Sequence, residues 1–386
     1  MGDAQRLSPE EQIRFARDAF EDGHDFTVAI EEEFMLLDSE TLELTNRFEE
    51  LKAAAAGTEL DDHLVGELIA SEIEVKTGRC PSFTEAAEQV GTRRGELAEL
   101  ADRFDVALAS TGTHPWSRWQ DQRIIDTPHY RQNNEILRYV VWRNNSFGIH
   151  VHIGIRGADR AIAVCNAFRN VLPELLALSA SSPFVEDCVT GLHSARTEIF
   201  TKMFPRCGIP DAYDGWRGFE EYVRFLYGTG SIAEHTQMWW SVRPHLAFPT
   251  IEVRICDAQP DLADAQALAA LMYALGVRFA RALDEGEPLP NHPHRLLEEN
   301  MWRAIRYGLT DGLIDFERGE VVPARARIEA LIEWVLPVAE EVGAASYLAV
   351  PDANSAERQY ARLEGLGSHR DVFAELVRRP RELVGG

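Results

Sequence analysis

The sequence predicts an α+β fold, with a sheet formed in the first two thirds of the chain and helices concentrated in the last third. Short segments with strand-like alternation occur up to about residue 257, and long segments with helical periodicity follow. Strands and helices do not alternate regularly, as they would in a βαβ series. No repeat, low-complexity tract or Pro/Gly linker divides the chain. We therefore expect a single domain, 1–386, in which a helical portion from about 261 packs on the sheet.

Two capping boxes mark the starts of helices in the first half of the chain. Ser8 is followed by Pro9 and Glu11, and Ser82 is followed by Glu85, which are the usual signals of a helix N-terminus. Apolar runs between and after these helices predict strands. The expected elements are a helix after Ser8, a strand over 26–37, a helix from Ser82 toward Phe104 and a strand over 106–111.

The second half is expected to contain three more strands and mainly helices. The segment from 181 to about 230 holds several prolines and glycines, so we expect it to be rich in loops. The other expected elements are a strand over 147–155, an apolar helix near 159–180, strands near 237–243 and 250–257, and helices near 261–284, 293–307, 323–343 and 354–364.

Charge and composition argue against several classes of partner. The chain has 63 acidic and 39 basic residues, a formal net charge of −24, which repels nucleic acid and anionic membrane surfaces. We expect no membrane span and no signal peptide, because no apolar run approaches about 20 residues and the N-terminus is polar. The five cysteines form no C-x-x-C pair, which argues against a zinc ribbon or a disulfide framework. A cytoplasmic protein with reduced thiols is expected.

The first group of candidate functional residues is a run of three glutamates in the predicted strand over 26–37. Because side chains alternate along a strand, Glu31 and Glu33 share one face and Glu32 points to the other. Apolar neighbours indicate a strand inside a sheet and not an exposed acidic edge. Two carboxylates about 7 Å apart repel each other unless cations neutralise them. Oxygen ligands of this kind suit Mg²⁺ or Mn²⁺ better than Zn²⁺.

Two further strands carry polar residues on one face. Glu72 and Glu74 alternate with apolar residues, and Glu67 precedes them on a turn. His150 and His152 share a face and lie between glycines, which allow a ligand to approach the backbone. A pair of histidines on one face indicates function more strongly than a single buried histidine does.

The strand near 250–257 carries Glu252 and Arg254 on one face, with Arg243 on the strand before it. An arginine beside a glutamate can be a simple salt bridge. It is also the combination that phosphoryl transfer requires, a carboxylate for a metal ion and a guanidinium for phosphate. The sequence contains no P-loop, no G-x-G-x-x-G after a strand, no G-x-S-x-G elbow and no H-E-x-x-H helix, so it does not support those sites.

In this order the motifs resemble those of the glutamate–cysteine ligase type 2 family of carboxylate–amine ligases. The resemblance covers roughly residues 27 to 310. Two departures occur: Ala29 stands where the family usually has Gly, and Leu192 and His193 replace a more usual aromatic residue, which is expected to alter the substrate pocket. The matching segments are 31–34, 67–74, 112–115, 148–152, 176–183, 240–244, 250–254 and 303–308.

The resemblance implies a glutamine-synthetase-like fold of the glutamine synthetase/guanido kinase type. In this fold a curved, mainly antiparallel sheet forms a funnel with helices packed outside. ATP would enter one end and the amino-acid substrate the other, with two or three Mg²⁺ ions between them and Mn²⁺ as the alternative metal. Small-molecule amino-acid and amine substrates are the implied partners. A homodimer is left open, because family members often form dimers.

The resemblance also assigns roles to particular residues. Catalysis is expected to depend on Arg254, which corresponds to the phosphate-contacting arginine, and on Glu252. The implied metal ligands are Glu31, Glu33, Glu67, Glu74, His150 and Glu252. The residues expected around the nucleotide are Arg254, Arg243 and His152.

The activity predicted from these assignments is an ATP-dependent ligation. The enzyme would join the γ-carboxylate of glutamate to cysteine or another amine through an acyl phosphate, with release of ADP and phosphate. Two alternatives stay open. One is a metal-dependent amide hydrolase, since His-x-His with carboxylates also builds water-activating sites, although Arg254 beside Glu252 argues against it. The other is a metabolite-binding protein without turnover, which the intact set of glutamates disfavours.

Overall fold

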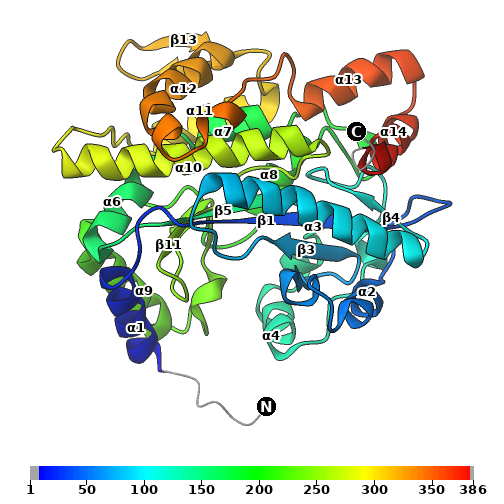
Figure 1. Cartoon of the computed structure of the whole chain (residues 1–386), viewed down its shortest axis with the longest axis horizontal. Coiled ribbons are helices and arrows are strands. Elements are labelled where there is room, and N and C mark those ends of the chain that lie inside the picture. The colour runs from blue at the N-terminus through cyan, green and yellow to red at the C-terminus, as the bar shows by residue number, and fades with distance from the viewer. Residues whose placement is uncertain (1–7, 383–386) are drawn as a thin grey trace.

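A seven-stranded sheet lies at the centre of the computed structural model, which describes residues 8–382 (Figure 1). The strand order is β10-β11-β5-β1-β3-β2, and β4 also pairs with β1. Every pair in this sheet is antiparallel, so the predicted α+β class with a mainly antiparallel sheet is confirmed. The strands are β1 (Val28–Asp38), β2 (Leu64–Val65), β3 (Glu72–Lys76), β4 (Val106–Ala109), β5 (Ile149–Gly154), β10 (Val242–Pro244) and β11 (Thr250–Val253).

Strand β1 organises this sheet because it is long enough to pair with three others. One edge pairs with β3, and the other edge pairs with β5 over its first half and with β4 over its second half. Both faces of β1 are covered, and all of its residues from Glu32 to Leu37 are buried. The central strand is therefore held on all sides before any ligand binds.

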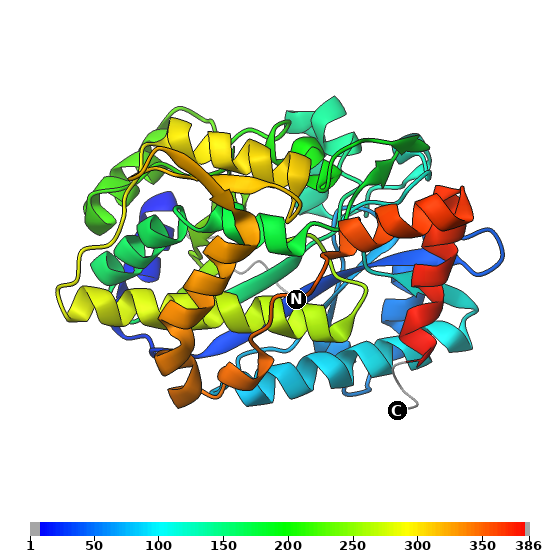
Figure 2. The same ribbon diagram turned by 90° about the horizontal axis from the view of Figure 1, so that it is seen from above.

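Two layers of helices cover one face of the sheet (Figures 1 and 2). Helix α10 crosses β5 so closely that a Cβ added at Gly276 would lie 2.8 Å from Ile153 Cδ1, which requires glycine there. The outer helices pack on α7 and α10 and not on the sheet itself. The inner layer comprises α3 (Phe83–Arg103), α6 (Ala158–Phe168), α7 (Leu172–Ser179) and α10 (Leu262–Asp284), and the outer layer α11 (His294–Tyr307) and α12 (Ala324–Glu341).

The opposite side of the sheet is covered by shorter helices and loops. In Figure 1 α1, α9 and α4 lie below the sheet, and α13 and α14 lie at its right-hand end. The helices outside the two layers are α1 (Pro9–Glu21), α2 (Phe48–Ala55), α4 (Pro128–Leu137), α5 (Tyr139–Trp142), α8 (Ala195–Thr201), α9 (Gly215–Gly228), α13 (Ser355–Leu366) and α14 (His369–Glu382). Short pairs join β6 (Phe184–Val185) to β7 (Cys188–Val189), β8 (Cys207–Gly208) to β9 (Trp239–Trp240), and β12 (Gly312–Asp315) to β13 (Glu320–Pro323).

Several local predictions are confirmed at helix ends. The capping box of Ser8 and Glu11 is complete, with both reciprocal hydrogen bonds formed. At the second helix Ser82 accepts a hydrogen bond from the Glu85 amide, which makes it an N-cap without the reciprocal bond of a full capping box. The predicted helices of the C-terminal third are found within one or two residues of their expected bounds. The first seven residues, part of the terminus expected to lack a signal peptide, lie outside the described residues.

Three expectations about the middle of the chain are corrected. The helix expected near 159–180 is two helices, α6 and α7, bent by 57° at a short break that Pro173 follows in the first turn of α7. The loop-rich segment from 181 to about 230 contains α8 and the 14-residue α9, whose regular amphipathic pattern its glycines obscure. The strand expected near 237–243 is split into β9 and β10. Helices α2, α4, α5 and α14 were not predicted.

Helix α10 also corrects the expectation that no apolar segment is long enough to cross a membrane. By length and composition α10 passes that test, as does the bent pair of α6 and α7 if it is counted as one span. In this structure 67% of the most apolar window of α10 is buried inside the protein. It packs on α6, α12 and β5, and burial on several sides accounts for its composition.

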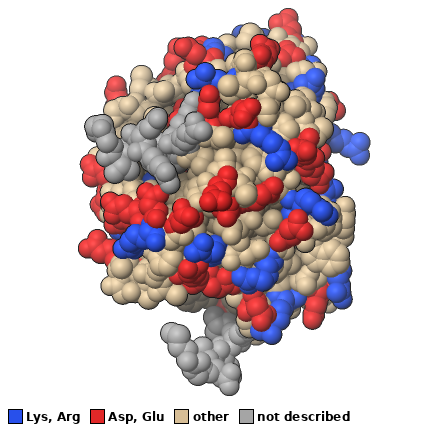
Figure 3. Space-filling model, turned by 90° about the vertical axis from the view of Figure 1, so that its right-hand side faces the viewer, with Lys and Arg blue, Asp and Glu red and all other residues tan. Residues whose placement is uncertain are grey.

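The surface and the cysteines agree with the composition. On the face drawn in Figure 3, Lys and Arg side chains lie scattered among Asp and Glu, and they form no continuous basic patch outside the area covered by grey residues. All five cysteines are described and free, and Cys80, Cys165 and Cys256 are buried. The absence of a disulfide framework is therefore confirmed.

Glu32 is separated from its two glutamate neighbours by the sheet, as strand alternation predicted. Its carboxylate accepts two hydrogen bonds from Arg94 of α3, from Nε at 2.8 Å and from Nη2 at 2.5 Å. Arg94 also donates to the carbonyls of Gln259 and Pro260, just before α10. This buried pair therefore ties the central strand to both long helices of the inner layer.

We expect Arg94→Met to lower the free energy of unfolding by about 3–5 kcal/mol, because the Glu32 carboxylate would stay buried without its partner. Urea unfolding followed by circular dichroism measures this change. Arg103→Met is the matched control, since Arg103 is exposed near the end of the same helix and its loss should cost less than about 0.5 kcal/mol. Equal stability of the two variants would show that the pair does not anchor β1.

Candidate active site

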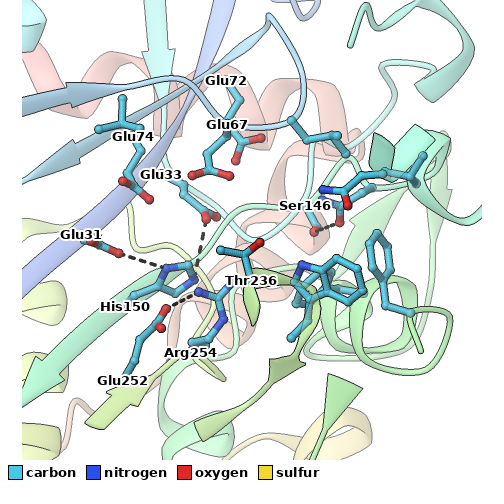
Figure 4. A pocket seen from close by; sticks show the side chains of 18 of the residues that line it. Glu31, Glu33, Glu67, Glu72, Glu74, Ser146, His150, Thr236, Glu252 and Arg254 are labelled. Carbon is cyan, nitrogen blue, oxygen red and sulfur yellow. Dashed lines mark hydrogen bonds and ion pairs between the residues drawn. The ribbon is translucent and has the colours of Figure 1, made fainter. Parts of the chain in front are cut away.

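A cavity of about 390 Å³ lies on the face of the sheet away from α3 and α10, between the sheet and the segment that contains α4 (Figure 4). The sheet supplies its acidic and basic side chains, whereas α4, α5 and α8 supply the opposite wall. All residues assigned to metal, nucleotide or catalysis from the sequence line this single cavity. They are Glu31, Glu33, Glu67, Glu74, His150, His152, Arg243, Glu252 and Arg254.

Strand register brings these residues together as directly opposed pairs. Between β1 and its two neighbours, Glu31 lies opposite His150 and Glu33 lies opposite Glu74. Further along the sheet His152 lies opposite Glu252, which in turn lies opposite Arg243. Directly opposed residues share a face, so five strands, β3, β1, β5, β11 and β10, place their functional side chains in one row. If one strand shifted by one residue against its neighbour, its functional side chains would point toward the helical layer and away from the cavity.

Three groups of side chains have the composition and spacing of metal sites. Within each group, one ligand atom per residue lies within 4.8 Å of the others. Carboxylate oxygens dominate, with one imidazole in two of the groups, which is the donor set that suits Mg²⁺ or Mn²⁺. The groups are Glu31, Glu74 and His150; Glu31, His152 and Glu252; and Glu33, Glu67 and Glu74.

The surroundings of His152 fit the role of a metal ligand, whereas the sequence placed this residue near the nucleotide. Its Nδ1 is hydrogen-bonded to Thr250 Oγ1 at 2.9 Å, which fixes the orientation of the ring. Its Nε2 is buried without a hydrogen-bond partner and lies 3.4 Å from Glu31 and 4.0 Å from Glu252. An orphaned imidazole nitrogen between two carboxylates is where a cation would be held. His152 was assigned from the sequence to the nucleotide, and the structure groups it with metal-type ligands.

Glu252 is held between two arginines. Arg243 Nε donates to one of its oxygens at 2.7 Å. Arg254 Nη1 donates to the other, as Figure 4 shows. Burial opposes ionisation, but the charges of Arg243 and Arg254 outweigh it and hold the pKa of Glu252 well below its usual range. The pKa of Arg254 is raised, because Glu252 outweighs the effect of burial. The three side chains therefore keep their charges inside the protein.

The carboxylates near Glu33 differ from Glu252, because their pKa values are raised and their protonated forms are favoured. Burial, followed by the charge of Glu33, raises the pKa of Glu67 to about 7. Burial raises the pKa of Glu74 well above its usual value, with Glu31 and Glu67 adding to the effect. Glu72, which the sequence placed on the same face but outside the metal shell, is also buried in this cavity and has a raised pKa for the same reasons. Clustered carboxylates of this kind require cations before they can all ionise.

The histidines respond to the charges around them. Burial lowers the pKa of His150, and the charge of Arg254 lowers it further, although the ring lies 3.6 Å from Glu31 and 3.7 Å from Glu33. For His152, Glu31 and Glu252 outweigh burial and raise the pKa. His150 is therefore neutral at physiological pH, the state in which imidazole binds a metal ion.

Several cavity residues were missed by sequence reasoning. Tyr130 and Asn133 come from the unpredicted helix α4, and Arg196 comes from α8 in the segment expected to be loop-rich. No local pattern marks them, because they reach the cavity through the packing of their helices. The expectation that Leu192 and His193 alter the substrate pocket is wrong. Neither lines the cavity, the Leu192 carbonyl accepts from the Tyr360 hydroxyl, and the His193 ring packs on that tyrosine.

A second cavity of about 400 Å³ adjoins the first and shares Glu31 and His152 with it. Its walls combine apolar and basic side chains from the ends of β1, β3 and β11. Ala29, where a glycine was the family's usual residue, lies opposite His152 in the register and contributes to this wall. The other lining residues include His24, Thr27, Lys76, Arg79, Phe248 and Pro249.

The chain has the fold of the glutamate–cysteine ligases. A glutamate–cysteine ligase from Francisella tularensis, solved in complex with AMP, superposes with a TM-score of 0.67 over 94% of this chain and 91% of that one, at 12% identity. A bifunctional glutathione synthetase from Pasteurella multocida gives a TM-score of 0.65 over 97% of this chain and 54% of that one, at 14% identity. At these identities the likeness establishes the fold alone.

Sequence comparison identifies the particular family. The model of glutamate-cysteine ligase family 2 matches residues 27–362. Relatives from Solibacter usitatus and Sorangium cellulosum, whose names assign them provisionally to glutamate–cysteine ligase 2, are 38% and 39% identical over 91% of this chain and 92% and 95% of their own. A relative of the same kind from Rubrobacter xylanophilus is 34% identical over 99% of this chain and 97% of its own. The chain therefore belongs to the glutamate-cysteine ligase family 2, a family of ATP-dependent ligases.

We expect Mg²⁺ to stabilise the protein more at about pH 8 than at about pH 5.5. The folded-state pKa of Glu67 lies above its unfolded value, so the metal-free protein loses stability as pH rises from about 4.5 through about 7. A divalent ion binds the ionised carboxylates, so its affinity rises over the same range. At 100 times its Kd, one bound ion adds about 2.7 kcal/mol. Thermal unfolding with and without MgCl₂ at both pH values measures the difference.

Glu74→Gln should remove most of this pH-dependent gain, because Glu74 belongs to two of the three metal-type groups. Glu88→Gln is the control, since Glu88 is exposed on α3 and should leave the gain intact. Equal stabilisation by Mg²⁺ at the two pH values would contradict the assignment of these carboxylates to cations.

Proposed function

We propose that this chain uses ATP to activate the γ-carboxylate of glutamate as an acyl phosphate and then transfers the acyl group to an amine. The observation that supports this most directly is the row of opposed pairs on five strands. It combines metal-type carboxylates with two arginines at one end of the same cavity. Such a site can bring the phosphates of a nucleotide and a substrate carboxylate together, because cations offset their mutual repulsion.

We assign the nucleotide to the second cavity and the amino-acid substrate to the first. Phe248, 58% exposed, and Pro249 offer an apolar surface to a purine ring, and Lys76 and Arg79 lie on the same wall. The triphosphate would then reach Glu31 and His152, which both cavities share. Entry from two ends onto one row of ligands matches the funnel expected of a glutamine-synthetase-like fold. The related fold of the Francisella tularensis ligase, solved with AMP, adds support.

In the first chemical step a carboxylate oxygen of the substrate attacks the γ-phosphorus of ATP. The bond between that phosphorus and the β–γ bridging oxygen breaks, and ADP leaves with the electron pair. Arg254 would contact the transferring phosphoryl group, while Arg243 keeps Glu252 oriented through its 2.7 Å hydrogen bond. Magnesium ions held by the three metal-type groups would supply positive charge to the phosphate oxygens.

In the second step the amine attacks the acyl carbon, the carbon–oxygen bond to phosphate breaks, and an amide and inorganic phosphate result. The amine loses a proton to the departing phosphate or to water. The sheet and the wall formed by α4, α5 and α8 enclose the site on two sides, which would reduce the access of bulk water to the acyl phosphate. Because ATP drives the reaction, we propose a cytoplasmic location. Family membership favours this ligation over the amide hydrolase and the non-catalytic binding protein.

We expect Glu252→Gln to remove ADP formation while the fold survives. The amide keeps one acceptor oxygen but loses the negative charge that orders Arg243 and Arg254 and contributes a metal-type ligand. A coupled assay of ADP release with Mg-ATP, glutamate and an amine panel, alongside circular dichroism, measures both properties. Glu320→Gln, on the exposed strand β13, is the control and should keep full activity. Unchanged turnover in Glu252→Gln would refute the role of Glu252.

Arg254→Lys should lower kcat by about 100-fold, because an ammonium group cannot offer phosphate the bidentate fork of a guanidinium. The charge is retained, so binding of Mg-ATP, measured by calorimetry, should change less than turnover does. Arg318→Lys, at an exposed position in the β12–β13 hairpin, provides the matched control. A near-normal rate for Arg254→Lys would remove Arg254 from the phosphate site.

A further inference from the structure

The end of the main cavity away from the metal-type groups has a largely apolar wall. Leu137 and Val141 come from α4 and α5, and Phe200 and Phe204 come from α8 and the turn after it. Phe204 lies between Phe200 and Trp239, with ring centroids 4.9 Å and 5.5 Å apart. This part of the cavity therefore suits an aromatic or aliphatic group.

Apart from Arg196 and His129, the polar side chains at this end are uncharged. Ser146 and Thr236 lie on the other side of His150 from Glu31 (Figure 4), and Asn133 and Asn144 line the cavity as well. Asn144 accepts a hydrogen bond from the Ser146 hydroxyl at 2.9 Å. The hydroxyl of Thr236 is buried and has no hydrogen-bond partner. These groups can bind an amine or a carbonyl, but they cannot neutralise a carboxylate.

The arginines of the cavity leave room for one substrate carboxylate at this end. Arg243 and Arg254 are both hydrogen-bonded to Glu252. Arg196 has no hydrogen-bonded carboxylate: Nη1 and Nη2 donate to the backbone carbonyls of Ile255 and Arg254, and the nearest carboxylate oxygen, on Asp257, is 3.8 Å away. Its Nε has no partner. We therefore assign Arg196 to the α-carboxylate of the glutamate substrate. The residues that line the cavity, all of them described, include no lysine.

The histidines supply no further free charge. His129 Nδ1 lies 2.5 Å from Glu234 Oε1, so that imidazole already has an acidic partner. The His245 ring stacks on Phe248 and contacts the ring of His152, with centroids 4.9 Å and 5.4 Å away, so it lies beside the metal-type groups and not at the uncharged wall. A second carboxylate entering this end would lose its hydration and gain no cationic partner.

We infer that the amine substrate is a primary amine with an aromatic or aliphatic group and without a carboxylate, and that it is not an amino acid such as cysteine. This inference rests on the proposed ligase function. Glutamate brings one carboxylate besides the reacting one, which Arg196 can take, whereas an amino acid would bring another. The apolar wall binds the carbon skeleton of the amine, and the uncharged polar groups bind its nitrogen.

Matched pairs of amines that differ only by a carboxylate test this inference. Phenethylamine is compared with phenylalanine, and cysteamine with cysteine, by Mg-ATP- and glutamate-dependent ADP release. We expect kcat/KM to be at least about 10-fold higher for the member of each pair that lacks the carboxylate. Equal or better turnover of the amino acids would overturn the inference. Hydroxylamine, which traps an acyl phosphate as a hydroxamate, is run in parallel.

The hydroxylamine reaction separates the two levels of the proposal. Hydroxamate formation without a preference for the simple amines overturns the substrate class and leaves the ligase function standing. No hydroxamate and no ADP with any amine overturns both. Either result is obtained with the wild-type protein, so neither depends on the folding of a variant.

A cation added to the uncharged wall should change the preference. Thr236→Arg should lower the ratio of kcat/KM for phenethylamine over phenylalanine by about 10-fold, because the new guanidinium can pair with the amino-acid carboxylate. Thr229→Arg places the same charge at the exposed end of α9 and is the matched control. Thermal unfolding confirms that each variant is folded. An unchanged ratio in a folded Thr236→Arg protein would count against this surface as the amine site.

Discussion

Repulsion among buried carboxylates is the constraint on which the rest of this structure depends. Glu31, Glu33, Glu67, Glu72 and Glu74 line one cavity. Burial, with the charges of neighbouring carboxylates added, raises the pKa values of Glu67, Glu72 and Glu74. Such a site lowers the stability of the metal-free protein, so the scaffold must hold it against its own electrostatics. The charge that destabilises the site is also what prepares it for cations, and through them for anionic substrates.

The sheet meets this constraint by being covered on both faces. Strand β1 is paired along both edges, and its opposite face is fixed by the two hydrogen bonds from Arg94 to Glu32. Helix α10 lies directly on β5 because Gly276 lets it approach Ile153 closely. A rigid frame of this kind keeps carboxylates close together where a flexible one would let them separate.

The two halves of the site differ in how their charge is balanced. Around Glu252, the arginines Arg243 and Arg254 provide internal counter-charges, so this part is fully ionised without ligand. Around Glu67 and Glu74 no arginine among the described side chains donates a hydrogen bond, and burial favours the protonated forms. The half around Glu252 can thus receive phosphate as it stands. The carboxylates around Glu67 and Glu74 ionise fully only when cations bind. Beyond both lies the uncharged wall at Thr236, where neither kind of compensation exists.

The sequence by itself determined the class of fold, the residues on each strand face and the family resemblance. It could do so because alternation along a strand is local: Glu31 and Glu33 share a face whatever pairs with them, and Glu32 must face the other way. It did not identify α4 or α8, so Tyr130, Asn133 and Arg196 were missed, and it placed Leu192 and His193 near a pocket that they do not line. Only the tertiary structure decided that Glu31 lies opposite His150 and Glu252 opposite His152. Register and helix packing join segments far apart in the chain, and their energies depend on contacts that no local pattern records.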